Sequence, residues 1–184
     1  MENSLKKHAG EFTAALASHK YERTGDERGL YFPKAKAFIS GLYIHDVNGF
    51  DERQDGNILP AEGLIYLLQT GLANGTKLAT WYLSLYAANY TPLAALTAAS
   101  YPATASEITS GTEGYTESTR PVWTPTTPTT PLVDNLLNKA AFTIATASSL
   151  TVNGAALLSE AAKGAVTGKI ASATKFSAAR TLYD

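Results

Sequence analysis

The sequence contains no cysteine. This absence excludes disulfide bonds, thiolate metal ligands and cysteine nucleophiles, so the fold must be stabilised by its packed core. Charge is scarce too, because Asp, Glu, Lys and Arg make up only 17% of the 184 residues and the formal net charge is -1. A chain so near neutrality has no strong field to attract nucleic acid, and we expect no nucleic-acid partner.

The few charges are unevenly placed. Residues 1–63 hold 18 of the 31 charged side chains, whereas none lies between Leu78 and Ser106. Asn, Ser, Thr, Tyr and Pro interrupt that neutral stretch, so we expect neither a membrane span nor a membrane partner. A surface this poor in charge suggests coverage by other protein. The N-terminal residues lack the apolar core of a signal peptide, which predicts synthesis in a cytoplasm.

Residues 1–29 are expected to form an N-terminal arm, with a turn or hinge at 24–29. Leu5, Phe12 and Leu16 recur at roughly helical intervals. Three large apolar side chains cannot hold such a helix together alone. The segment is therefore either a frayed tail or an arm that gains order on a partner. In the second case, Leu5, Phe12 and Leu16 are the candidate contact residues.

The next segments predict a strand and a helix. Aromatic and β-branched residues alternate from Phe38 to the Asn48-Gly49 pair, which predicts a strand that ends in a tight turn. Residues 62–74 predict a short helix, because leucines recur at i, i+3, i+4 and i+8. These leucines are Leu64, Leu67, Leu68 and Leu72. Asn74-Gly75 is typical of a helix end.

The remainder predicts mostly sheet. Polar and apolar residues alternate from Leu78, and further strand candidates are 113–123, 139–146, 149–158 and 168–176. Residues 93–105 are rich in alanine, but Pro102 and the threonines favour an irregular loop there. One helix among at least six short strands predicts a mainly β fold, either a β-sandwich or a jelly-roll-like barrel.

Pro125, Pro128 and Pro131 punctuate a threonine-rich stretch at 124–131. Such prolines hold the backbone near polyproline II and cannot enter a central strand. Composition does not change across the stretch, which favours a stiff loop inside one β-rich domain spanning residues 30–184. The alternatives are an interdomain linker and a ligand for a proline-binding groove, although no basic residue orients such a ligand.

No catalytic motif is evident. His45 adjoins Asp46, but neighbours on a strand point to opposite faces, and no nucleophile elbow, phosphate loop or dinucleotide fingerprint occurs. We therefore expect no enzyme, no catalytic residue and no cofactor.

Residues 51–62 partly match a calcium loop through the residues Asp51, Asp55, Gly56 and Glu62. Arg53 occupies a ligand position, and the preceding segment predicts a strand where a helix is required. We therefore interpret residues 51–62 as an acidic turn that leads into a helix and expect no bound metal.

A set of segments carries a resemblance. The chain contains "EGLIYLLQTGL", "TWYLSLYAANYTP", "GYTESTRPVWTP" and "KAAFTIAT", followed by a glycine-punctuated ending with a Phe-x-x-x-Arg motif at Phe176 and Arg180. The third segment fits the pattern Y-x-E-x-x-R-P-x-W. In this order, over about residues 60–182, the segments resemble a group of tailed-phage virion proteins taken as structural components.

The resemblance implies a virion protein that decorates and stabilises the capsid shell as a minor capsid or head decoration protein. Its implied partners are the major capsid protein and further copies of itself, as a trimer, and the arm would reach onto capsid subunits. The alternative is a tail or tail-fibre module that binds a host-surface glycan, and a small hydrolase is a third possibility. Trp123 and Tyr115 exposed in a groove would favour the glycan, and the same rings in the core would favour the shell.

Overall fold

The computed structural model describes residues 21–23, 31–33, 39–128 and 130–184. The chain separates into two units, Met1–Ile39 and Ser40–Asp184. In the first unit, β1 (Tyr21–Arg23) pairs antiparallel with β2 (Tyr31–Pro33). Leu5, Phe12 and Leu16, together with the expected turn at 24–29, lie outside the described residues. Their proposed roles stay predictions.

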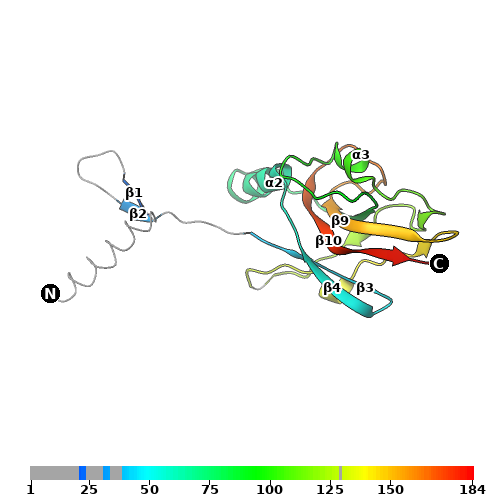
Figure 1. Ribbon diagram of the computed structural model, residues 1–184. Helices are drawn as coiled ribbons and strands as arrows, with labels where there is room; N and C mark the ends of the chain where they lie inside the picture. The colour runs from blue at the N-terminus through cyan, green and yellow to red at the C-terminus, as the bar shows by residue number, and fades with distance from the viewer. Residues whose placement is uncertain (1–20, 24–30, 34–38, 129) are drawn as a thin grey trace. The chain divides into compact units, whose positions relative to one another are not determined.

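The second unit is built mainly from antiparallel strands, as expected (Figure 1). A four-stranded sheet has the order β10-β9-β5-β7. Its strands are β5 (Trp81–Tyr86), β7 (Val122–Trp123), β9 (Leu150–Leu158) and β10 (Ile170–Leu182). Two smaller pairs are β3 (Leu42–Val47) with β4 (Phe50–Gly56), and β6 (Gly114–Tyr115) with β8 (Ile144–Ala145). The helices are α2 (Ala61–Leu72), α3 (Tyr101–Ala105) and the 3-10 turn η1 (Leu136–Asn138).

The β3–β4 hairpin confirms the expected Asn48-Gly49 turn. Both residues have positive φ, 52° and 80°, as a tight hairpin turn requires. The interpretation of residues 51–56 as an acidic turn is wrong, because they belong to strand β4. Asp, Glu and Gly are poor strand formers, but the turn brings this segment against β3, and cross-strand pairing outweighs intrinsic preference.

The helix expected at 62–74 is confirmed as α2. Pro60 precedes its first residue, and Asn74 adopts the left-handed conformation with φ 54° just beyond its end. The Gly75 N–H then donates a 2.8 Å hydrogen bond to the Gln69 carbonyl, which closes the last turn as the Asn-Gly pair predicts.

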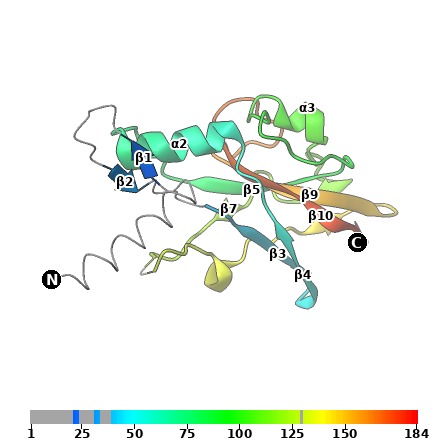
Figure 2. The same ribbon diagram turned by 60° about the vertical axis from the view of Figure 1, so that its left-hand side comes forward.

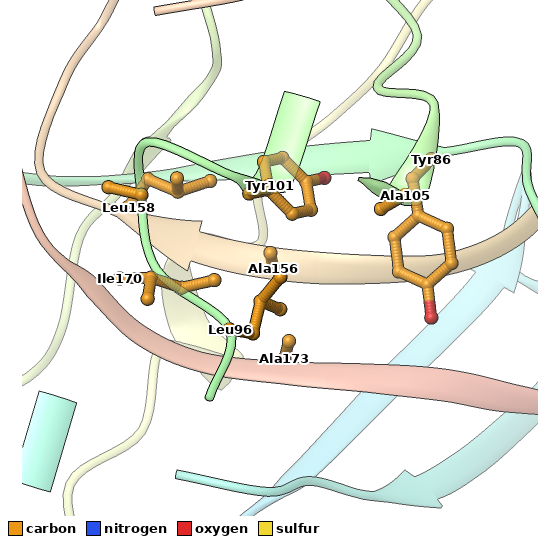
Figure 3. Packing of buried hydrophobic residues seen from close by; sticks show 9 residues of the cluster. Tyr86, Leu96, Tyr101, Ala105, Ala156, Leu158, Ile170 and Ala173 are labelled. Atoms are coloured by element: carbon orange, nitrogen blue, oxygen red, sulfur yellow. The ribbon is translucent and has the colours of Figure 1, made fainter. Parts of the chain in front are cut away.

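The four-stranded sheet has a hydrophobic cluster on each face. Leu85 and Tyr86 are consecutive on β5 and therefore point to opposite faces, and each belongs to a different cluster. The first cluster, drawn in Figure 3, consists of Tyr86, Leu96, Ala98, Tyr101, Ala105, Ala156, Leu158, Ile170 and Ala173. The second consists of Leu85, Ile108, Tyr115, Val152, Ala155 and Phe176. The alternation expected along β5 thus separates two buried faces rather than an inner and an outer one.

The prediction of an irregular loop at 93–105 is wrong in part, because the last five residues of this stretch form α3. Pro102 lies in the first turn of this helix, where a missing N–H costs nothing. Tyr101 and Ala105 anchor α3 because both are fully buried in the first cluster.

The remaining strand expectations hold to different degrees. The candidates 149–158 and 168–176 correspond to β9 and β10, and β10 continues to Leu182. The candidates 113–123 and 139–146 yield only the two-residue strands β6, β7 and β8. The Pro-Thr stretch 124–131 follows β7 within the second unit.

Candidate functional site

A buried ion pair joins Glu107 to Arg120. The Arg120 Nε and Nη2 atoms each donate a 2.7 Å hydrogen bond to the Glu107 carboxylate, and both side chains are 0% exposed. Glu107 lies two residues beyond the end of α3, and Arg120 lies two residues before the start of β7. The pair therefore ties the α3 segment to the edge of the four-stranded sheet. A two-bond arginine–carboxylate contact fixes both distance and orientation.

Further polar groups complete this buried network. The Ser84 hydroxyl donates to Glu107 Oε1 at 2.8 Å, and the Tyr101 hydroxyl donates to Ser84 Oγ at 3.0 Å. The Gly164 N–H donates to Glu107 Oε2 at 3.0 Å. Arg120 Nη1 donates to the Glu160 carbonyl at 2.9 Å. Each carboxylate oxygen thus accepts two hydrogen bonds, as a buried charge requires.

The Y-x-E-x-x-R-P-x-W segment owes its pattern to internal bonding. Arg120 serves the ion pair, and the Glu117 carboxylate accepts from the Thr143 N–H at 3.0 Å. The Pro121 carbonyl accepts from the Leu83 N–H at 2.8 Å, which joins the segment to β5. Trp123 lies opposite Trp81 across the β5–β7 pair. The segment therefore has a structural role, because its charged side chains, Glu117 and Arg120, are hydrogen-bonded to other groups of the same chain.

Tyr115, the first residue of that pattern, is fully buried in the second cluster. The Lys163 ammonium lies 3.6 Å from the centroid of the Tyr115 ring and donates to the Tyr115 carbonyl at 2.7 Å. Burial raises the pKa of the phenol above its ordinary value. Within the described part of the chain, the Tyr115 hydroxyl has no hydrogen-bond partner.

A second polar cluster fastens the β3–β4 hairpin to β10. His45 Nε2 lies 2.9 Å from Asp55 Oδ2, and Arg180 Nε donates to His45 Nδ1 at 3.1 Å. The imidazole stacks on the Phe176 ring with centroids 3.9 Å apart. Since Nδ1 accepts from Arg180, the ring is neutral with its proton on Nε2, which donates to Asp55. Both members of the Phe-x-x-x-Arg motif thus contact His45: Phe176 stacks on its ring, and Arg180 donates a hydrogen bond to it.

The titration of this cluster follows from its contacts. Burial lowers the pKa of His45, and the neighbouring Arg180 cation lowers it further, although the hydrogen bond to Asp55 opposes both. Burial would raise the pKa of Asp55, but hydrogen bonds from His45 and from the Ser177 N–H outweigh it and hold that pKa below its ordinary value. Both ring nitrogens of His45 are hydrogen-bonded within the chain, so the imidazole holds the β3–β4 hairpin against β10 and is not free to act as a base.

The expectation that His45 and Asp46 do not form a pair agrees with this geometry. Asp46 instead accepts from Lys139 Nζ at 2.8 Å. The His45–Asp55 pair was missed, since the two residues are ten positions apart and come together only through the hairpin.

The residues considered for a calcium loop are also held apart. Asp51 accepts from Arg53 and Arg180, whereas Asp55 accepts from His45. Glu62 Oε2 accepts from the N–H groups of Ala98 and Ile170, each at 2.9 Å. Over the described ranges, no group of three or more His, Asp or Glu side chains is placed to hold a metal ion. The expectation of no calcium site stays a prediction.

Exposed apolar side chains, in contrast, are concentrated on α2. Only Gly63 and Tyr66 of this helix are buried. The large apolar residues that remain exposed on it are Leu64, Ile65, Leu67, Leu68 and Leu72. A second exposed group follows the Pro-Thr stretch and comprises Leu132, Val133, Leu136 and Leu137. Exposed apolar residues gathered on one helix, as on α2, point to an interaction site.

A shallow depression of about 340 Å³ borders α2. Its walls are formed by Ala61, Glu62, Ile65, Tyr66 and Gln69 of the helix together with Thr97 and Lys169. The Lys169 ammonium lies 3.7 Å from Glu62 Oε1 at its rim.

Within the part of the chain that the structure describes, no helix is both long and apolar enough to cross a membrane.

Comparison with known proteins gives no relative: no family model, no curated protein and no solved structure matches the chain. The site must therefore be interpreted from its own geometry, in which two bonded polar clusters stabilise the fold and the exposed apolar face of α2 is available for contact.

Proposed function

We propose that the protein is a structural virion component that decorates and stabilises a phage capsid shell by binding major capsid subunits. One observation carries the proposal. The charged residues of both resemblance motifs, Glu117, Arg120 and Arg180, are bonded to other groups of the same chain. The exposed surface of α2, in contrast, is apolar. Such a surface suits permanent assembly rather than turnover of a substrate.

In this proposal the N-terminal arm supplies part of the attachment. Leu5, Phe12 and Leu16 are its candidate contacts with a capsid subunit, and each would gain roughly 1.5–3 kcal/mol on full burial. Ordering the arm costs more than these three contacts supply, because fixing the backbone alone costs about 1–2 kcal/mol per residue. The arm therefore contributes to binding only if the body docks as well.

The finer architecture belongs to the same proposal. The four-stranded sheet has a buried cluster on each face, and the β6–β8 pair contributes Tyr115 and Ile144 to the second. Two sheets that share a core in this way support a sandwich or jelly-roll-like body. The trimer that the resemblance implies belongs to the same proposal, as one of the closed symmetric assemblies that copies of one chain form.

The alternative function is a tail or tail-fibre module that binds a host-surface glycan. The partly buried Trp81 and Trp123 lie at opposite positions on β5 and β7, and an accessible indole ring is suited to stacking on a sugar. Tyr115 argues against this alternative, because its ring lies in the core and is inaccessible to a sugar.

Localisation in the intact particle separates the two functions. An electron-microscopy map of the virion should show the 184-residue protein at repeated positions on the icosahedral lattice. Density confined to the tail would refute shell decoration. In that case, Trp123→Ala should abolish binding to host-surface polysaccharide, with Trp81→Ala as the companion variant on the facing strand.

A further inference from the structure

We propose that α2 is a self-association surface, on which the apolar face of one copy packs against the same helix of a second copy. The first argument is the spacing of its outward residues. Ala61, Ile65, Leu68 and Leu72 follow one another at intervals of four, three and four. All four are exposed, and Leu68 and Leu72 keep 51% and 84% of their surface. This spacing is that of a seam between two helices.

The inward side of α2 shows that the exposed face cannot turn into the core. A Cβ atom at Gly63 would lie 2.4 Å from the Ala171 carbonyl oxygen, so the helix already touches β10 as closely as a backbone can. The Tyr66 hydroxyl accepts from the Leu78 N–H at 2.8 Å, and its ring meets Trp81 edge-on. These contacts fix the rotation of α2 and leave its leucines exposed. The helix itself lies along one side of the second unit (Figure 2).

Charge identifies the occupant. Glu62 is the only charged residue of α2, and its carboxylate is turned inward to Ala98 and Ile170. A second copy therefore meets no like charge on the helix. Among the described residues, a charged partner would find only Lys169 at its edge, and that ammonium already lies 3.7 Å from Glu62. A lipid surface is disfavoured, because helices that lie on membranes carry Lys or Arg along their polar face. Here no basic residue occurs between Arg53 and Lys77.

Size and shape agree with this occupant. The exposed apolar side chains of α2 form a patch on the order of several hundred Å², which is as large as the largest patch on a typical monomer. Two such patches, with the residues around them, approach the roughly 1,200 Å² that a specific interface needs. Ala61 and Ile65 also wall the depression of about 340 Å³, so a side chain from the partner helix has a recess to enter.

The test uses the full chain and two matched positions. Leu68 lies in the middle of the seam, and Leu137 on η1 is an equally large residue that is 85% exposed elsewhere. Sedimentation equilibrium over a range of concentrations should show reversible self-association. We expect Leu68→Glu to raise the dissociation constant by about 100-fold, whereas Leu137→Glu leaves it unchanged. Circular dichroism and a thermal melt verify that both variants are folded.

Because the chain has no cysteine, a conservative second test is available. Leu68→Cys should give a disulfide-linked dimer under mild oxidation, and Leu137→Cys should not. A chain that stays monomeric at all concentrations would overturn the proposal, whether the N-terminal segment or another protein then covers α2. So would association that Leu68→Glu leaves intact. Self-association through α2 would stand even if the protein were found on a tail, so the two proposals can fail separately.

Discussion

Arg120 and Glu107 are joined by two 2.7 Å hydrogen bonds in an ion pair that has no solvent exposure. The pair stabilises the fold only while both partners are present, because each alone would be an uncompensated buried charge. It is also the point at which the α3 segment, β5 and the loop containing Gly164 meet.

Removing one partner of the Glu107–Arg120 pair should strongly lower the stability of the fold. We expect Arg120→Met to lower the free energy of unfolding by about 3–5 kcal/mol. The double variant Glu107→Gln with Arg120→Met should lose less than the single one, because the amide removes the stranded charge and still accepts from Ser84. Urea unfolding measures both. Equal stability of Arg120→Met and the parent would show that the pair contributes nothing net.

Two buried tyrosines provide a matched comparison. The Tyr86 hydroxyl donates to the Thr174 carbonyl at 2.8 Å, whereas the Tyr115 hydroxyl has no partner among the described residues. Tyr86→Phe should cost about 1–2 kcal/mol because it strands an acceptor. Tyr115→Phe should be neutral or stabilising, since it removes a buried polar group that gains nothing. A large loss for Tyr115→Phe would imply a bonded water or ligand at that hydroxyl.

Two glycines of α2 should respond in opposite directions to alanine. At Gly63 the new methyl group would collide with β10 backbone, whereas at Gly71 nothing lies within 4 Å. Gly71→Ala should therefore stabilise by about 0.4–1 kcal/mol through reduced freedom of the unfolded chain. Gly63→Ala should destabilise by about 1–3 kcal/mol, as overpacking does. Thermal melts of the two variants measure the difference, and equal melting temperatures would contradict the close contact.

The contacts of His45 with Asp55 and Arg180, which hold the β3–β4 hairpin against β10, should weaken in acid. His45 has a pKa below its ordinary 6.5 in the folded state, so the unfolded chain binds its proton more readily. Stability from this contact is present above pH 6.5 and is lost as pH falls below it. Asp55, whose pKa also lies below its ordinary 3.8, adds a loss in the same direction at lower pH.

His45→Gln is the control for this pH dependence. Glutamine cannot titrate, so the variant should lose the part of the stability decline below pH 6.5 that His45 causes. Denaturant midpoints taken across that window provide the measurement. A variant that declines as steeply as the parent would show that other groups are responsible.

The His45–Asp55 pair illustrates where sequence reasoning stopped. The Asn48-Gly49 turn correctly predicts a hairpin that pairs Val47 with Phe50. A regular ladder would then place His45 opposite Glu52, with Asp55 on the other face. Instead, one extra residue bulges from β4 near Asp51, which has φ 50°, so His45 faces Arg53. A bulge changes which side chains share a face of the hairpin. No local pattern in the sequence predicts this bulge.

The long strands and α2 were predictable, because their periodicity and end residues act locally. The short strands β6, β7 and β8 were not, because each is defined by a partner distant in sequence. The same is true of Glu107. It gave no signal in the sequence, and only the fold brings it to Arg120, 13 positions away.

The most direct test of the proposed shell role is binding of the purified full chain to genome-free shells of the encoding phage's major capsid protein. Co-sedimentation should show saturable binding in fixed proportion to capsid subunits. Weaker binding is expected for the variant with Leu5→Asp and Leu16→Asp, whose second unit remains folded. Absence of binding to shells, together with binding to isolated tails, would contradict the account.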